Sequence, residues 1–434
     1  MIKKKLILVP SYKMDDNKKP DRDEHSLIRM SAKVRDNMGF DQDKVEVYQE
    51  NGSPILLNIF KAFSEDIKKI RSTGEFDEEQ LSRIAFVSSN TFNALTGKNE
   101  GIANDVWISN DINKVVFGTD PELLMFHNGE IINANNVLEF VGELGCDGAM
   151  AEVRPMPAGD PEQLVENIRS ILKSQKYKNI VDRYDLVAAC YYKNNIRDYP
   201  VGGHIHIGNP VEVTEIDFPD REYMFKTINK IMDELIAIPM IKLDGDVGKI
   251  RRTDCQMSKT GGYGYFGEYR LAPQRPYKIR RLEHRTLSGM WMLHPSLAKA
   301  VLGSAKAVID EVWRLLANQK FNVEYAYPGE YKDKHIWKAD FDGWKDMQLC
   351  RDMGCTASSE EMIKKLNSSV ANDINKTFLD KWLKKMRNMS TFKNYEKFIT
   401  SLYEILKHPI KELQEYDRVI QHNWLEDKKF IVDI

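Results

Sequence analysis

The feature that most constrains this chain is the stretch VGGHIHIGNP at residues 201–210, where two histidines alternate with two isoleucines between glycines. Successive side chains of a β-strand point to opposite faces of the sheet. The alternation therefore predicts a strand that buries Ile205 and Ile207 and turns His204 and His206 toward a cleft. The flanking glycines allow turns and a close approach of a ligand or another backbone. A strand end that faces solvent gives the same pattern. The rest of the sequence must therefore show whether these histidines belong to a site.

Three further stretches carry charged residues at every second position, as one face of a strand does: Asp120 and Glu122 in GTDPELL; Glu152 and Arg154 in DGAMAEVRPMPA; Arg281, Glu283 and Arg285 in RRLEHRTLSG. Apolar residues, glycine or proline flank each stretch, which is unlike a solvated strand rich in Lys and Glu. If these strands are neighbours, their carboxylates repel one another unless cations compensate. Such oxygen ligands suit Mg²⁺ or Mn²⁺, and arginines suit phosphate. The combination indicates phosphoryl transfer from a nucleotide.

The order of these motifs resembles a known family. The sequence runs D-P-E, then D-G-x-x-x-E-x-R-P, then G-G-H-I-H-I-G, then R-x-E-x-R followed by a helix that begins HPSLAKAVL. Over about residues 114–310 this resembles the phage-encoded carboxylate–amine ligases of the glutamine-synthetase-like superfamily. The resemblance implies an α+β fold whose curved antiparallel sheet binds ATP and two or three Mg²⁺ ions, with Mn²⁺ as an alternative. It also implies ligation of a small-molecule or peptide carboxylate to an amine through an acyl phosphate.

The same resemblance implies roles for individual residues. The metal ligands that it implies are Asp120, Glu122, Glu152, His204 and Glu283. The nucleotide-binding residues that it implies are His204, His206, Arg281 and Arg285. The arginines that it implies for catalysis, holding phosphate and the developing acyl phosphate, are Arg281, Arg285 and Arg270.

The chain also departs from the glutamine synthetase pattern. It has Asp120-Pro-Glu122 where glutamine synthetase has Glu-x-Glu. A second glutamate that would accompany Glu152, and the base that deprotonates the amine, are not evident in the sequence.

The character of the sequence changes twice, which predicts three parts: a small N-terminal α/β domain of unknown role at 1–110, the catalytic domain at 111–318 and a mostly helical C-terminal region at 319–434. In the first part, residues 5–10 and 83–89 are typical of strands, whereas 26–38 and 55–70 have helical spacing. In the second, Asn128-Gly129 predicts a hairpin, and Asp160-Pro161 predicts the start of a helix. The Gly-rich, basic and aromatic stretch 244–270 is expected to be a loop, either a mobile flap over the substrate or an ordinary surface loop.

Composition excludes several classes of protein. The formal net charge of −2 provides no general basic field for nucleic acid. The five cysteines are scattered without a C-x-x-C pair, which argues against a zinc ribbon or a disulfide scaffold and favours a reducing cytosol, that of a bacterial host if the protein is phage-encoded. No stretch has the length and apolarity of a membrane span. The sequence does not indicate an oligomeric state.

Two other functions remain open at this point. A metal-dependent hydrolase also uses His-x-His on a strand, but it needs further histidine or aspartate ligands. The later histidines are His284, His294, His335, His408 and His422, and alternation places His284 on the face opposite Glu283. A non-catalytic phage protein that binds metal or nucleotide is the third reading. Costly like charges retained together argue against it.

Overall fold

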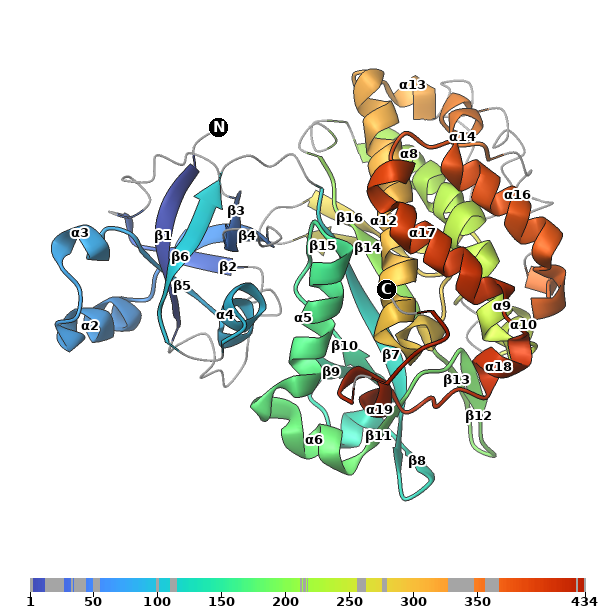
Figure 1. The fold of residues 1–434 in the computed structure, drawn as a ribbon, viewed down its shortest axis with the longest axis horizontal. Helices are drawn as coiled ribbons and strands as arrows, with labels where there is room; N and C mark the ends of the chain where they lie inside the picture. The colour runs from blue at the N-terminus through green and yellow to red at the C-terminus, as the bar shows by residue number, and fades with distance from the viewer. Residues whose placement is uncertain are drawn as a thin grey trace.

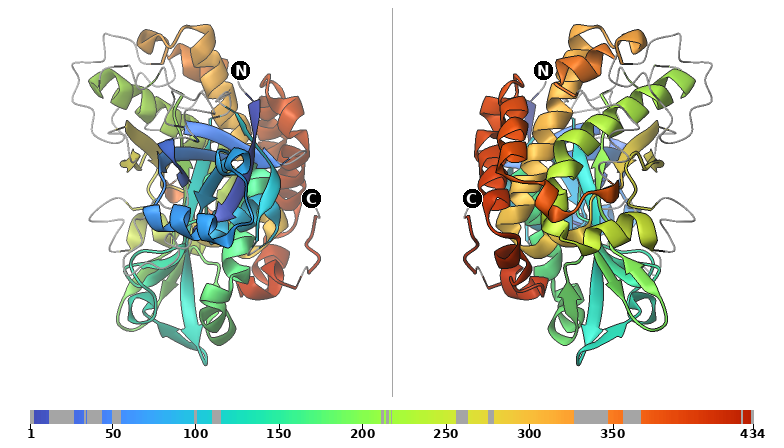
Figure 2. Two further views of the ribbon diagram at one scale, coloured as in Figure 1. Left: turned by 90° about the vertical axis from the view of Figure 1, so that its left-hand side faces the viewer. Right: turned by 90° about the vertical axis from the view of Figure 1, so that its right-hand side faces the viewer.

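The computed structural model describes residues 3–11, 27–32, 34, 44–49, 55–98, 101–109, 115–210, 213, 216, 218–255, 263–274, 279–326, 347–355, 367–426 and 428–432. A β-barrel with three short helices lies at one end, and a larger body of sheet and helices lies beside it (Figure 1). Figure 2 shows that most helices of the larger body gather on one side of its sheet.

Six strands near the N-terminus close into the barrel in the order β1-β5-β2-β4-β3-β6. Their bounds are Lys3–Pro10 (β1), Leu27–Met30 (β2), Lys44–Gln49 (β3), Ile55–Lys61 (β4), Ile84–Val87 (β5) and Ala103–Ser109 (β6). The pairs β1–β5 and β2–β4 are parallel, and the other neighbours are antiparallel. Every strand contributes to one buried apolar cluster that fills the barrel, and Met156, which follows the strand Met150–Val153 of the larger body, also belongs to this cluster. Helices α2 (Ser64–Thr73), α3 (Glu78–Leu81) and α4 (Ser89–Thr96) connect the later strands.

The predictions of helices at 26–38 and 55–70 are partly wrong. Residues 27–30 form β2 and residues 55–61 form β4, while the helix within 55–70 begins only at Ser64. A short apolar run fits a helix and a buried strand equally well. Here β2 and β4 pair in parallel with each other, so both runs form strands. The expected strands at 5–10 and 83–89 are confirmed as β1 and β5.

The larger body is built on an eight-stranded sheet in which all the strand pairs are antiparallel. The main order is β15-β16-β14-β7-β10-β9, and β8 and β11 also pair with β7. The bounds are Phe117–His127 (β7), Glu130–Ile132 (β8), Leu144–Asp147 (β9), Met150–Val153 (β10), Asp185–Val187 (β11), Gly203–Ile207 (β14), Tyr269–Gln274 (β15) and Ile279–His284 (β16). A separate hairpin joins β12 (Tyr191–Lys193) and β13 (Asp198–Pro200). The antiparallel sheet with its helices confirms the α+β class.

The predicted local signals are present at the hairpin and at the helix starts. Asn128 and Gly129 both have positive φ in the turn between β7 and β8. Asp160 accepts hydrogen bonds from two backbone N–H groups at the start of α5 (Pro161–Lys173), and His294 caps α12 (Pro295–Asn318). In contrast, part of the expected loop 244–270 is helical: α10 (Val247–Lys249) continues into the π-helical η5 (Ile250–Asp254).

The remaining helices include α6 (Lys178–Arg183), α8 (Phe218–Met232), the π-helical η4 (Asp233–Ala237), α9 (Ile238–Asp244), α13 (Val323–Ala326), α14 (Gln348–Asp352), α16 (Lys376–Arg387), α17 (Phe392–Lys407), α18 (Ile410–Gln414) and α19 (Ile420–Trp424). The C-terminal third is mostly helical where it is described, as predicted. In the described part of the chain, no helix combines the length and apolarity needed to cross a membrane.

Alternation along the central strands separates two kinds of face. Ile205, Ile207 and Leu282 are buried in the main apolar core, which also contains residues of α8 and α12. The side chains between them therefore project from the other face of the sheet. That face carries the ionisable residues of the site.

Candidate active site

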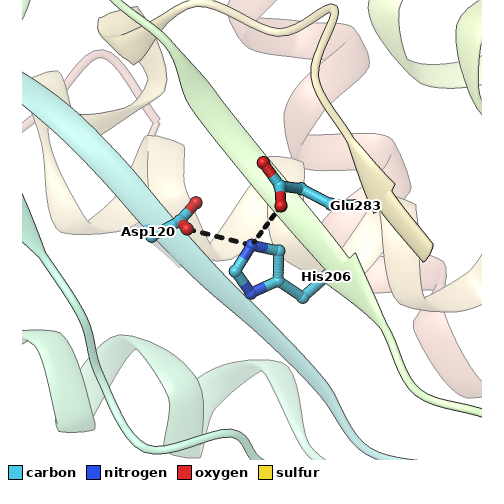
Figure 3. Close-up of side chains that lie close together, drawn as sticks. All are labelled: Asp120, His206 and Glu283. Carbon is cyan, nitrogen blue, oxygen red and sulfur yellow. Dashed lines mark ion pairs between the residues drawn. The ribbon is translucent and has the colours of Figure 1, made fainter. Parts of the chain in front are cut away.

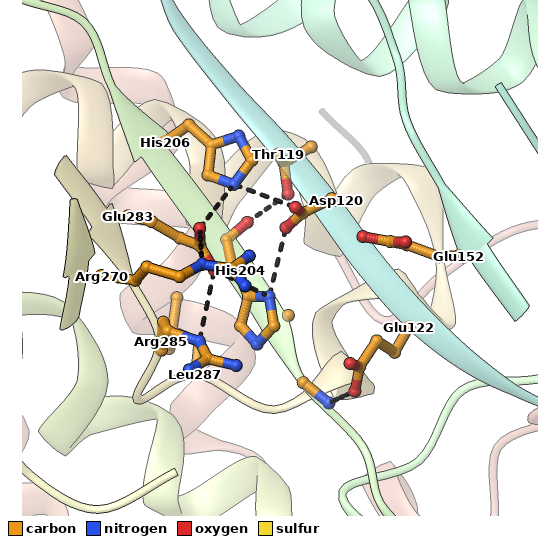
Figure 4. Close-up of polar contacts among 12 residues, drawn as sticks. Thr119, Asp120, Glu122, Glu152, His204, His206, Arg270, Glu283, Arg285 and Leu287 are labelled. Carbon is orange, nitrogen blue, oxygen red and sulfur yellow. Dashed lines mark hydrogen bonds and ion pairs between the residues drawn. The ribbon is translucent and has the colours of Figure 1, made fainter. Parts of the chain in front are cut away.

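Strand pairing brings the four sequence motifs together. β14 lies between β7 and β16, so that His204 stands opposite Asp120 and His206 stands opposite Glu283. On the other side of β7, Glu152 of β10 is paired with Glu122. Figure 4 shows the resulting group of side chains over β7, β14 and β16.

Three of these residues form a compact group that fits a divalent cation. His206 Nε2 lies 3.0 Å from Asp120 Oδ2 and 3.8 Å from Glu283 Oε2, and one ligand atom from each residue lies within 4.8 Å of the others (Figure 3). All three side chains are buried. Within the described residues, His206 Nε2 and Glu283 Oε1 form no hydrogen bond, although Asp120 Oδ2 and Arg285 Nε lie within ion-pair distance of them. Buried polar atoms are normally hydrogen-bonded, so both atoms can accept a further interaction with a bound cation. The sequence assigned His206 to the nucleotide; its position makes it a metal-ligand candidate too.

A second group adjoins the first. His204 Nδ1 lies 3.2 Å from Asp120 Oδ1 and 3.7 Å from Glu283 Oε1. Its other nitrogen, Nε2, lies 3.0 Å from the Tyr263 hydroxyl, which donates a hydrogen bond of 2.7 Å to Glu122 Oε2. The sequence analysis missed Tyr263, whose only signal was its place in a Gly-rich stretch between two motifs.

Glu152 has a dedicated cationic partner. It is hydrogen-bonded and ion-paired to Arg154. The guanidinium of Arg154 also donates to the carbonyls of Gly142 and Cys146, each at 3.1 Å. A Cβ at position 145 would lie 2.2 Å from Arg154 Nη1, so the glycine there leaves room for the guanidinium. Arg154 therefore compensates Glu152.

Two of the three arginines assigned to phosphate lie at the group. Arg270 Nε donates to Glu283 Oε2 at 2.8 Å. Arg285 Nε lies 3.2 Å from Glu283 Oε1, and its Nη1 donates to Glu268 Oε1 at 2.9 Å. Arg281 forms no ion pair or hydrogen bond through its side chain with the residues that the structure describes, and its Nε is buried. Its assigned role stays a prediction.

Burial and charge pull the pKa values of the carboxyls in opposite directions. Burial alone would raise the pKa of Asp120, but His206 and His204 hold it well below its usual range. Burial and the charges of Asp120 and Glu122 raise the pKa of Glu152 well above its usual range, although Arg154 opposes this. Burial also raises the pKa of Glu122. Without a bound cation, the site therefore resists carrying all its negative charges at once.

The later histidines that the structure describes are engaged elsewhere. His284 Nε2 lies 2.9 Å from Asp233 Oδ1, and both side chains are buried. His294 caps α12, His408 pairs with Glu412, and His422 pairs with Asp417. His335 lies outside the described residues. The described histidines therefore supply none of the additional ligands that a hydrolase built on His-x-His would need.

Comparison with known families agrees with this geometry. The sequence model of the family described as "Phage phiEco32-like COOH.NH2 ligase-type 2" matches residues 117–373, from the first residue of β7 onward. The chain belongs to this family. The match includes every residue that the motifs assigned to the site. The resemblance to carboxylate–amine ligases is therefore confirmed. The matched residues do not include the barrel strands.

Solved structures also match this chain, and one of them is a glutamine synthase homologue. This chain is similar to a solved structure described as "Crystal structure of novel glutamine synthase homolog", with 13% sequence identity, a TM-score of 0.37, and coverage of 72% of this chain and 70% of that chain. No curated protein matches the sequence.

Proposed function

We propose that this COOH·NH2 ligase joins a carboxylate to an amine in an ATP- and Mg²⁺-dependent reaction that passes through an acyl phosphate and releases ADP and phosphate. Family membership supports the ligation. The observation that carries the metal and nucleotide part is the buried group of Asp120, His206 and Glu283, which unites an imidazole and two carboxylates within 4.8 Å. Mn²⁺ suits the same donors.

The residues divide the work by charge. Asp120, His206 and Glu283 would hold one divalent cation. The neighbouring Glu122, Glu152 and His204 would supply further ligands. When bound, such ions neutralise the charge of the terminal phosphates of the nucleotide. Arg270 and Arg285 each carry five guanidinium N–H donors, more than their bonds to Glu283 and Glu268 require. Their remaining donors can bind phosphate or carboxylate oxygens.

The acyl phosphate is one of two ways to activate the carboxylate, and adenylation is the other. Condensation of a carboxylate with an amine is uphill in water, so the carboxylate must first be activated. Arginines that face the transferred phosphoryl group stabilise the charge that develops on it. We assign this role to Arg285 and Arg270, which both contact Glu283, and propose that Arg281 shares it. The amine then attacks the acyl carbon and phosphate leaves.

Isotope transfer tests the mechanism directly. Pools of small-molecule and peptide carboxylates and amines are first screened for ATP consumption, because the substrates are unknown. With an ¹⁸O-labelled carboxylate, one label should appear in the released phosphate, and ADP should form in equal amount to the amide. AMP and pyrophosphate, with the label in AMP, would contradict the proposal.

A thermal shift separates the ligase from the hydrolase alternative. A ligand that binds the native state raises its melting temperature. MgATP should therefore raise the melting temperature of this protein. A response to Zn²⁺ with none to MgATP would favour the hydrolase.

A further inference from the structure

Tyr263 links two residues that the motifs assign to metal binding. Its hydroxyl oxygen lies 2.7 Å from Glu122 Oε2 and 3.0 Å from His204 Nε2. The side chain is buried, and its ring meets the His204 ring edge-on, with 5.8 Å between centroids. A Cβ at Gly202 would lie 2.3 Å from both the tyrosine oxygen and His204 Nε2, so the backbone there approaches as closely as a glycine allows.

With Glu122 ionised, the hydrogen-bond inventory assigns the protons of this group. A tyrosine hydroxyl has one proton to donate, whereas an ionised carboxylate can only accept. Glu122 Oε2 already accepts the backbone N–H of Gly202 at 2.6 Å, and it also accepts the hydroxyl proton of Tyr263. The phenol oxygen must then accept its second hydrogen bond, which comes from His204 Nε2–H.

This arrangement leaves the other nitrogen of His204 with a lone pair. A neutral imidazole carries a single N–H, and the bond made by one nitrogen determines the state of the other. His204 Nδ1 lies 3.2 Å from Asp120 Oδ1 and 3.7 Å from Glu283 Oε1. Three acceptors therefore face one point. Arg285 Nε reaches one of them, Glu283 Oε1, at 3.2 Å, and a cation at that point, either a second proton or a metal ion, would bind all three.

We propose that Tyr263 is a positioning residue that holds His204 in the Nε2-protonated tautomer and thereby directs Nδ1 to a divalent cation. The proposal deepens the function above and rests on its metal dependence. It assigns the cation a second imidazole besides His206. It also gives Glu122 a positioning role, because Glu122 accepts the hydrogen bond of the Tyr263 hydroxyl.

The ring of Tyr263 is held in place independently of its hydroxyl. The guanidinium carbons of Arg285 and Arg251 lie 4.9 Å and 5.5 Å from the ring centroid, within range of cation–π attraction. Arg251 is buried and donates to the carbonyls of Thr286 and Leu287 at 2.8 Å and 3.0 Å. A Tyr263→Phe substitution therefore removes the hydroxyl while it keeps the packing of the ring.

The test compares Tyr263→Phe with Tyr265→Phe in the full-length protein. Tyr265 lies in the same turn, and its hydroxyl forms no hydrogen bond within the described residues. Mn²⁺ affinity is measured by electron paramagnetic resonance and Mg²⁺ affinity by calorimetry, without substrate. Loss of a residue that orients a metal-binding histidine weakens metal affinity by roughly 10- to 100-fold, and we expect this for Tyr263→Phe and no change for Tyr265→Phe.

Histidine NMR shows which nitrogen of His204 carries the proton. This tautomer would not change if Tyr263 only stabilised the fold. In ¹⁵N-histidine-labelled protein with Mg²⁺, His204 should carry its proton on Nε2 in the wild type. In Tyr263→Phe a substantial fraction should shift the proton to Nδ1, where it can bond Asp120. The signal is assigned by its disappearance in His204→Asn.

The outcomes separate this inference from the proposed function. A wild type that binds neither Mn²⁺ nor Mg²⁺ overturns the metal dependence and this inference with it. A wild type that binds metal, with unchanged affinity in Tyr263→Phe, overturns the inference alone. Weaker affinity with the proton still fully on Nε2 also overturns it, because the tautomer is then not what Tyr263 controls.

Discussion

The barrel and the eight-stranded sheet are both built from β-strands, but they bury different kinds of side chain. All six barrel strands direct apolar side chains into one interior cluster, with Leu6 and Leu8 from β1 among them. In the sheet, β14 and β16 bury Ile205 and Leu282 on one face. On the other face they bury histidines and carboxylates, and Glu283 has no exposed surface at all.

The difference shows where stability and function are located. Burial of apolar surface stabilises a fold by about 25 cal/mol per Å², whereas a buried ion group roughly breaks even or costs stability. The apolar interior of the barrel therefore contributes stability. The charged face of the sheet depends on the apolar packing of the opposite face to keep its shape. This arrangement is expected of a site that binds a charged ligand.

The largest effect should come from the charged face. Glu283→Gln keeps the shape of the side chain but removes the charge that faces His206, Arg270 and Arg285. Mg²⁺-dependent ATP turnover should fall by about 10³-fold, or ~4 kcal/mol of transition-state stabilisation, while circular dichroism stays unchanged. Steady-state kinetics measures this, and wild-type turnover in the variant would remove Glu283 from the site.

A substitution in the barrel should have the opposite effect to Glu283→Gln: it should lower stability and leave MgATP binding unchanged. Leu8 is fully buried, so Leu8→Ala leaves a cavity and should lower the local free energy of unfolding by about 3 kcal/mol. MgATP affinity should stay the same, because the family match and the charged group lie outside the barrel. Hydrogen exchange of barrel peptides measures the loss, and calorimetry measures MgATP binding. Loss of MgATP binding in a folded variant would show that the barrel belongs to the site.

The sequence predicted the strands that carry the charged residues better than the strands of the barrel, for a physical reason. Charged residues at every second position have few explanations other than a strand face, so β7, β10, β14 and β16 could be identified as strands. Short apolar runs such as those of β2 and β4 fit either a helix or a strand, and only their pairing distinguishes the two. Tyr263 could not be predicted, because its contacts with Glu122 and His204 span 141 and 59 residues.

A third, smaller effect concerns the cost of charge at the site. The folded protein holds the pKa of Glu152 above its unfolded value, chiefly through burial and then through the charges of Asp120 and Glu122. The folded state therefore binds this proton more tightly, and stability falls as pH rises above the unfolded pKa of roughly 4.3. Glu152→Gln removes this cost and should stabilise the metal-free protein at neutral pH.

Thermal denaturation in a chelator, followed from acid to neutral pH, measures this change. The wild type should lose stability across that window, and Glu152→Gln should follow a flatter curve. Adding Mg²⁺ should narrow the gap, because cations relieve the same repulsion in the wild type. A variant that is less stable than the wild type at neutral pH would mean that the ion pair with Arg154 outweighs the burial of Glu152.

The smallest effect should come from an ion pair on the surface, which sets the baseline for the other three. Lys397 Nζ lies 2.6 Å from Glu162 Oε1, but the two side chains are 55% and 45% exposed. Solvent and salt screen such a pair, which is worth about 0.2–1 kcal/mol. Glu162→Gln should therefore lower the unfolding free energy by no more than about 0.5 kcal/mol and leave ATP turnover unchanged. The substitution removes the same charge as Glu283→Gln, so the ratio of the two turnover rates isolates burial at the site from the loss of a carboxylate as such. If Glu162→Gln also reduced turnover strongly, the helix that carries Glu162 would have to take part in the reaction, and the contrast between a charged site and its supporting scaffold would be wrong at that point.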